Sequence, residues 1–387
     1  MFNFDEIIDR RHTQCVKWDG IQEAFGREDL LPLWVADMDF KTPDFVIAAL
    51  RKRLEHEVLG YQLRPRSFFE AAQAWLHRRN GWEVALSDLA FLPGVVPALS
   101  FAVHAFTRPG DKILIQPPVY HPFRYAVENH GRQLVCNPLH ENDGVYSIDF
   151  EDFEAKLATG VRMFILCNPH NPVGKVWSEE DLWRMGALCC RYKTLILSDE
   201  IHSDLVFKPH KHVHIAALSE ELAQQTLTFF APSKTFNMGG MFTSVAHSAN
   251  KELLQTLTSY MEKMHLFHGS IFGDLTLEAA YNHGDAWLDA LLDYLSGNFD
   301  YVVQYLQDEV PGMKTHRPEG TYLMWLDARE LGLEPKALQQ KMMDAGLGFN
   351  SGDLFGVEGA GFLRLNAACP RQRLEQACAA LRTVIRE

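Results

Sequence analysis

The sequence predicts an α/β protein in which a doubly wound domain with a mainly parallel sheet is followed by a smaller α+β domain. From about residue 40 to residue 250, helical patterns alternate with short, largely apolar runs, which are Lys112–Gln116, Met163–Cys167, Thr194–Ser198 and Leu227–Ala231. The runs show no in–out alternation, so we expect parallel strands that helices bury on both faces. Strands and helices that alternate in this way indicate a doubly wound domain.

Several helix ends can be predicted from the residues at them. Pro43 is expected to open a helix, because proline is tolerated in the first turn. Ser67 is expected to cap a helix over Phe68–Arg79, which Asn80–Gly81 should end. A longer helix is expected over about Asp285–Gln307.

The C-terminal part is expected to form the smaller domain. It contains strand patterns at Gly320–Asp327 and Phe362–Asn366, and helical patterns at Pro335–Ala345 and from about Arg373 to Ile385. A chain of 387 residues is also too long for one compact core. We therefore expect a large domain over residues 41–284 and a small domain made of residues 1–40 and 285–387.

Composition and charge exclude several classes of function. The formal net charge is −13, which argues against nucleic acid or an anionic membrane as a partner. Met1–Arg10 has no signal-peptide pattern, and no apolar run is long enough to span a bilayer. The seven cysteines are scattered without a CxxC pair, as expected of reduced thiols in the cytoplasm.

Three successive strands are expected to end in residues that could carry chemistry. The first is followed by Asn171 in an Asn–Pro–Val–Gly turn, the second ends in Asp199, and the third leads to Lys234. Open α/β sheets bind ligands at the carboxyl ends of their strands. Pyridoxal phosphate (PLP) needs a lysine amine to hold it and a carboxylate that keeps its ring nitrogen protonated. Each residue alone could be an ordinary strand-end polar group, but the combination favours a PLP site.

Further residues fit the same chemistry. Gly94 permits a tight turn into a helix that begins at Val95–Val96–Pro97, and free N–H groups at a helix start suit a phosphate. A glycine turn before a helix is common in proteins, so this feature alone does not indicate a phosphate site. Tyr120 follows another strand and could cover a cofactor ring, and Arg364 lies in an apolar strand where it needs an acidic partner such as a substrate carboxylate.

Taken together, these motifs resemble fold-type I PLP enzymes of the class I/II aminotransferase superfamily, over essentially the whole chain. Within it, five stretches are similar to MalY/PatB-type cystathionine β-lyases, also called C–S lyases. These stretches are Trp34–Phe40, Gly94–Leu99, Asp199–Asp204, Ser233–Asn237 and Arg364–Arg371. The resemblance implies the PLP-dependent transferase fold, like that of aspartate aminotransferase, and a homodimer with shared active sites.

The resemblance also implies a role for each matching residue. Lys234 would hold PLP as a Schiff base and move protons, and Asp199 would pair with the ring nitrogen. The ring would further be contacted by Asn171, His202 and Tyr120. The phosphate would be bound by Gly94, Val95, Val96, Ser233 and, from the neighbouring subunit, Tyr61. The substrate carboxylate would be clamped by Arg364 and contacted by Ala36 and Asn171.

Two positions depart from the family pattern. A phosphate-binding serine often stands three residues before the lysine, where this chain has Ala231. An arginine often stands eight residues after it, where this chain has Phe242. Ser233 could compensate in part.

Three functions follow as hypotheses: a C–S β-lyase, an aminotransferase that uses the same lysine and carboxylate, and a binding or regulatory protein on this fold. The first is favoured by the lyase-like stretches. A metal site is a further alternative, because His210, His212 and His214 alternate along one segment and imidazoles can bind metals. No acidic or cysteine ligand accompanies them, so we expect a surface loop and no metal.

Overall fold

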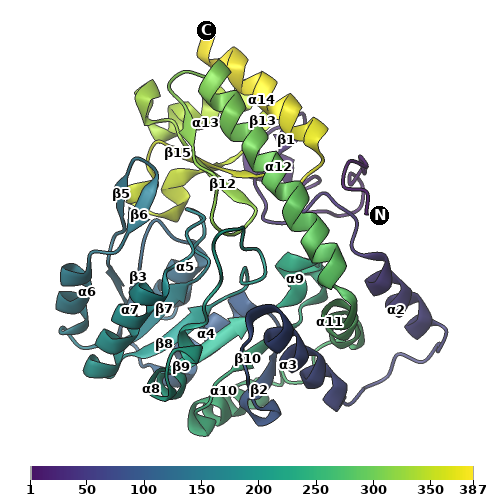
Figure 1. Cartoon of the computed structure of the whole chain (residues 1–387), viewed down its shortest axis with the longest axis vertical. Helices are drawn as coiled ribbons and strands as arrows, with labels where there is room; N and C mark the ends of the chain where they lie inside the picture. The colour runs from purple at the N-terminus through teal and green to yellow at the C-terminus, as the bar shows by residue number, and fades with distance from the viewer. Residues whose placement is uncertain (1, 387) are drawn as a thin grey trace.

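The computed structural model describes residues 2–386 and contains two main sheets, one above the other in Figure 1. The larger sheet has seven strands in the order β2-β10-β9-β8-β7-β3-β4. Along the chain these strands are β2 (Leu89–Leu92), β3 (Lys112–Ile115), β4 (Gln133–Cys136), β7 (Val161–Cys167), β8 (Leu195–Asp199), β9 (Thr226–Phe230) and β10 (Ser244–His247). The four strands predicted for this sheet are present within two residues of their expected ends.

The larger sheet is mainly parallel, as expected. Strands β4, β3, β7, β8 and β9 run in parallel, whereas β10 is antiparallel to both β9 and β2. The central strands β8 and β9 are almost entirely buried, which explains why they are apolar on both sides. The sheet therefore presents the ends of β7 and β8 at one edge.

Helices pack on this sheet and on one another. Among them, α11 lies against both α2 and α3, and α10 against α4. The helices of this part are α2 (Asp44–Leu54), α3 (Arg66–Asn80), α4 (Val95–Phe106), α5 (Pro122–Glu128), α6 (Phe150–Leu157), α7 (Glu179–Tyr192), α8 (Glu220–Gln225), α9 (Pro232–Thr235), α10 (Lys251–Lys263) and α11 (Ile271–His283).

The smaller sheet has four strands in the order β11-β12-β15-β14. The long helix α12 runs from the larger sheet to the smaller one, where α14 lies beside it (Figure 1). The elements of this part are α12 (Asp285–Glu309), β11 (Lys314–Thr315), β12 (Leu323–Asp327), α13 (Pro335–Asp344), β13 (Leu347–Gly348), β14 (Asn350–Ser351), β15 (Phe362–Asn366) and α14 (Arg371–Arg386).

The N-terminal segment lies with this C-terminal part. Its strand β1 (Leu31–Pro32) pairs in parallel with β13, and its short helix α1 (Ile21–Phe25) precedes that strand. The pairing supports a small domain built from residues 1–40 and 285–387, and we keep that division as a proposal. A hairpin of β5 (His140–Asn142) and β6 (Val145–Ser147) completes the strands.

One predicted helix cap is wrong. Helix α3 begins at Arg66, its N-cap residue is Pro65, and Ser67 lies inside the first turn. The extended backbone of Pro65 delivers the chain directly into the helix, so a serine cap is not used. The predicted end is confirmed, because Gly81 adopts a left-handed φ of 67° that closes the helix.

All seven cysteines are free thiols. Among the described residues, no helix combines the length and apolarity needed to cross a membrane.

Candidate active site

A cavity of about 170 Å³ lies at the carboxyl ends of β7 and β8. It brings together most of the site residues that the sequence predicts. The predicted residues that line it are Ala36, Gly94, Val95, Val96, Tyr120, Asn171, Asp199, His202, Ser233 and Lys234. Arg364 is joined to this group through Asn171, whereas Tyr61 is not part of it.

Lys234 stands in the short helix α9, directly after β9. Its Nζ donates a hydrogen bond of 2.6 Å to the backbone oxygen of Ala36. Burial lowers the pKa of Lys234 to about 8, and the positive charge of Arg364 adds to the decrease, while Asp37 and Asp199 oppose it. A larger fraction of this amine is therefore neutral, and so nucleophilic, than for an ordinary lysine.

Asp199 is the last residue of β8, and its side chain is buried. Its Oδ1 accepts a hydrogen bond of 3.1 Å from the N–H of Ile201. Burial raises the pKa of Asp199 to about 7, and the charge of Glu200 adds to this, while the Ile201 N–H and Lys234 lower it. A buried carboxylate of this kind needs a cation to stay ionised. A protonated pyridine nitrogen fits that requirement.

The turn before α4 suits a phosphate group. Gly94 has a φ of 138°, and a Cβ at this position would lie 3.3 Å from the side chain of Pro97. No side chain caps this end of α4, so its first N–H groups are available to an anion. Of the residues that line the cavity, Lys234 is the sole lysine or arginine, because Phe242 stands where an arginine was expected; Ala231, in place of the expected serine, also lines the cavity.

Arg364 and Asn171 form a hydrogen-bonded pair at the cavity. Arg364 lies on β15, and its Nη1 donates to Asn171 Oδ1 at 3.0 Å while its Nη2 donates to the backbone oxygen of Trp34 at 2.8 Å. Burial lowers the pKa of Arg364 to about 10, and its Nε has no hydrogen-bond partner among the described residues. A guanidinium in this state is well suited to a carboxylate ligand.

Two rings complete the cavity. The backbone of Tyr120 is held in place because its N–H donates a hydrogen bond of 2.9 Å to the backbone oxygen of Asn171. His202 is buried with an unpartnered Nδ1, and burial lowers its pKa well below the usual value, helped by the charges of Lys234 and Arg364. His202 is therefore a neutral imidazole here.

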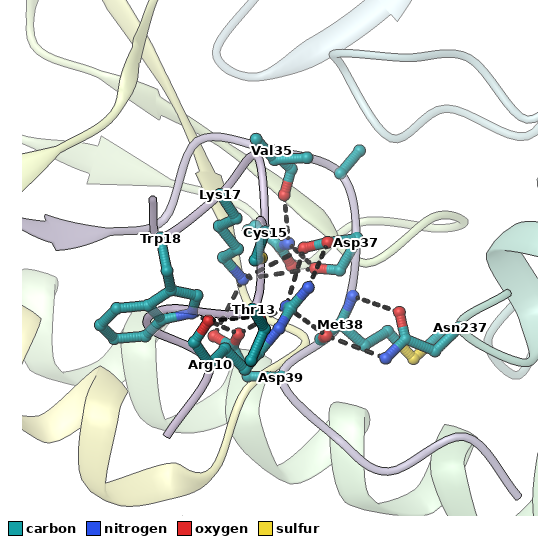
Figure 2. A network of polar contacts seen from close by, with 12 residues as sticks. Arg10, Thr13, Cys15, Lys17, Trp18, Val35, Asp37, Met38, Asp39 and Asn237 are labelled. Atoms are coloured by element: carbon teal, nitrogen blue, oxygen red, sulfur yellow. Dashed lines mark hydrogen bonds and ion pairs between the residues drawn. The ribbon is translucent and has the colours of Figure 1, made fainter. Parts of the chain in front are cut away.

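The segment Trp34–Phe40 passes the cavity at Ala36 and is held by side chains for which the sequence predicts no role. Asn237 accepts a hydrogen bond from the N–H of Met38 and donates to the backbone oxygen of Met38 (Figure 2). It also donates to the backbone oxygen of Phe40. Asn366 donates to the oxygens of Val35 and Asp37. The hydroxyl of Tyr322 donates to Ala36 O at 2.8 Å.

Ionic contacts hold the same segment from the other side. Lys17 and Asp39 are both buried, and Lys17 Nζ lies 2.9 Å from Asp39 Oδ2. Arg10 contacts both Asp37 and Asp39, at 2.7 Å and 2.9 Å (Figure 2). The sequence indicates only that Trp34–Phe40 and Ser233–Asn237 both resemble the lyase pattern. That resemblance does not predict the contact between the two stretches.

The predicted surface loop at the histidines is wrong for two of them. His212 and His214 are buried, and both contact the same oxygen of the buried Glu200, with His212 Nε2 at 3.0 Å. Ser198 Oγ donates to the other Glu200 oxygen at 2.7 Å. The acidic group that seemed to be missing is therefore Glu200, which directly follows β8 in the chain. The third histidine, His210, is partly exposed.

The contacts around Glu200 form a hydrogen-bond network. Although burial opposes it, the two imidazoles lower the pKa of Glu200 to about 2. The three ligand atoms lie within 4.8 Å of one another, as a metal site would require. However, the outer ring nitrogens of both histidines have no partner among the described residues, and metal-binding histidines usually have one.

Tyr61 lies outside the cavity. Its side chain is 99% exposed in the irregular segment between α2 and α3. The nearby exposed apolar residues are Leu54, Val58, Leu59, Leu63, Met264, Leu266 and Phe267. The one ring contact described for Tyr61 is with His268, and the two ring centroids lie 5.9 Å apart.

The fold and the cavity together define an α/β enzyme that is built to hold a cofactor at the carboxyl ends of its large sheet. The chain belongs to the aminotransferase class I and II family, whose sequence pattern matches residues 28–381.

Comparison with individual proteins narrows the family. The chain is 44% identical to the cystathionine beta-lyase PatB of Bacillus subtilis (strain 168), over 96% of this chain and 97% of that protein. It is 33% identical to the protein MalY of Escherichia coli (strain K12), over 100% and 99%. Its structure matches that of the PLP-bound C–S lyase from Staphylococcus hominis with a TM-score of 0.94 and 32% identity, over 100% and 99% of the two chains.

Proposed function

We propose that this protein is a PLP-dependent C–S β-lyase that acts on L-cystathionine or a related cysteine thioether. The observation that carries the proposal is the single cavity that holds Lys234, Asp199 and Asn171 next to Arg364. The relatives favour the reaction type, since PatB is named a cystathionine β-lyase and the Staphylococcus hominis protein a C–S lyase.

PLP, when bound, supplies an aldehyde for an amine to attack and a ring that accepts electrons. Lys234 would hold the cofactor covalently, and its Nζ would later move the proton at the substrate Cα. With a pKa of about 8, roughly a tenth of this amine is neutral at pH 7. Its contact with Ala36 O fixes where the amine stands.

The other ring contacts follow from the positions of the side chains. Asp199 would keep the pyridine nitrogen protonated, and Tyr120 would cover the ring. The amide nitrogen of Asn171 has no described partner and would donate to the ring hydroxyl, with His202 beside it. These groups are buried, so their electrostatic contribution is stronger than in water.

The phosphate would be bound by the N–H groups that follow Gly94 and by Ser233. Tyr61 would contribute from a neighbouring subunit, because its exposed side chain lies among exposed apolar residues and away from its own cavity. A homodimer with shared sites is therefore part of the proposal.

The substrate carboxylate would bind to Arg364, beside the backbone at Ala36. Once the Cα proton has gone to Lys234, the leaving thiolate departs from Cβ, and water completes the products. L-cystathionine and water would thus give pyruvate, ammonia and homocysteine.

The test is to supply holoenzyme with L-cystathionine, with and without a 2-oxo acid acceptor. Pyruvate and homocysteine formed without acceptor would support the lyase. The aminotransferase alternative is favoured by the name of the family itself. Turnover that requires the acceptor and yields a new amino acid would replace the lyase by that reaction.

A further inference from the structure

A second cavity, of about 680 Å³, adjoins the first at the seam between the two sheets. Tyr120 lines both cavities. The second is bounded by residues around α5 on one side and by α1, α13 and the turn Gly352–Phe355 on the other. The two sides are joined by a hydrogen bond of 2.9 Å from the N–H of Val119 to the oxygen of Phe355.

The seam cavity comes close to Arg364 through two of its lining residues, Trp34 and Phe355. The backbone oxygen of Trp34, a residue that lines the cavity, accepts hydrogen bonds from both Arg364 and Asn350. The guanidinium of Arg364 also lies 4.8 Å from the ring centre of Phe355, which lines the same cavity. An amino acid whose carboxylate is bound to Arg364 therefore has this space open to its side chain.

The walls near Arg364 are aromatic and uncharged. The rings of Phe25 and Trp34 meet edge to face at 5.5 Å, and His121 contacts both Phe355 and Tyr125. Burial lowers the pKa of His121 to about 4, and the charge of Arg364 adds to this, so the imidazole is neutral at pH 7. Such walls suit an apolar or aromatic group.

The charged residues that line the seam cavity, Arg124 and Asp353, lie at its solvent end. Arg124 is exposed on α5 and forms no described ion pair, although it lines the cavity. Asp353, the one acidic residue in the lining, already accepts a hydrogen bond from Ser351 at 2.5 Å. The free cation at the mouth is therefore Arg124.

We propose that the seam cavity binds the leaving-group half of the substrate, and that Arg124 favours thioethers whose leaving group ends in a carboxylate. This inference rests on the proposed C–S lyase function. It assigns the substrate class: L-cysteine conjugates with a bulky or extended apolar thiol half and a terminal acid.

The test compares three cysteine conjugates as substrates of the holoenzyme: S-methyl-L-cysteine, S-benzyl-L-cysteine and S-(4-carboxybenzyl)-L-cysteine. The last two differ by one carboxylate. Pyruvate formation should give a higher kcat/KM for the carboxybenzyl than for the benzyl compound. Arg124→Gln should reduce that ratio three- to tenfold, because an exposed ion pair is weak. Arg108→Gln, an exposed arginine outside both cavities, is the matched control.

A second variant tests the cavity itself. Tyr125 is 47% exposed, so Tyr125→Leu should fold, and it should lower the kcat/KM for S-benzyl-L-cysteine relative to S-methyl-L-cysteine. Unchanged ratios in both variants, or the same change in Arg108→Gln, would overturn the inference. If none of the three compounds yields pyruvate, the lyase function fails first. Pyruvate from all three without selectivity leaves the lyase intact and refutes only the role of the seam cavity.

Discussion

Replacing Asp199 by asparagine should cost far more activity than stability. The amide keeps an oxygen that can accept the hydrogen bond from Ile201, which now spans 3.1 Å, so the end of β8 should keep its conformation. The charge, however, is lost. Removing one partner of a buried ion pair costs about 3–5 kcal/mol, which corresponds to a decrease in kcat/KM of roughly two to three and a half orders of magnitude.

The matched control is Asp204→Asn, which replaces a half-buried carboxylate on the same segment. Asp204 accepts hydrogen bonds from Trp75 at 2.9 Å and Thr235 at 2.7 Å, and it forms no ion pair among the described residues. Its replacement should lower the melting temperature and change kcat/KM by less than about tenfold. Pyruvate release from L-cystathionine and thermal unfolding are measured on both variants. Similar, mild losses of activity in the two would refute the pairing of Asp199 with the cofactor.

Three further outcomes are expected. Borohydride should fix PLP on Lys234, and capture of PLP by the apoprotein should rise with pH around a midpoint near 8, since the amine must lose its proton first; a midpoint above 10 would contradict the effect of burial. Mixing Tyr61→Phe with Lys234→Ala subunits should restore activity in hybrid dimers, and no gain despite confirmed subunit exchange would argue against shared sites. Glu200→Gln should lower the free energy of unfolding by about 2–3 kcal/mol in a urea titration, because a neutral amide loses the charge that strengthens the hydrogen bonds to both imidazoles, whereas the exposed Glu179→Gln should change it little.

The strands and the meeting of Asn171, Asp199 and Lys234 could be predicted from the sequence. Parallel strands bring their carboxyl ends to one edge, so residues some thirty positions apart in the chain become neighbours. Strand β15, with Arg364 at its centre, was predicted with its observed ends. The antiparallel strand β10 was not predicted, because its four residues carry no distinctive pattern.

The burial of His212 and His214 could not be predicted, because their partner is defined by strand geometry. Successive side chains of a strand point to opposite faces, so Glu200 turns away from the cavity that Asp199 faces. The negative charge of Glu200 then lies close enough to help raise the pKa of Asp199. Glu200 lies twelve residues before His212 in the sequence, so it was not recognised as the acidic group whose absence led us to expect a surface loop. The alternation of the histidines, which suggested a metal site, places the rings of His212 and His214 against this one carboxylate.

The hydrogen bonds of the segment Trp34–Phe40 connect substrate binding to the reacting lysine. Arg364 holds this segment at Trp34 O and Lys234 holds it at Ala36 O, two residues further along. A substrate carboxylate bound there would replace some of the hydrogen bonds that the guanidinium makes to Trp34 and Asn171. Asn366 holds the segment at Val35 and Asp37, Tyr322 holds it at Ala36, and Asn237 holds it at Met38. Because these contacts restrain every residue between Trp34 and Met38, the segment fixes where the Arg364 guanidinium and the Lys234 amine stand relative to each other.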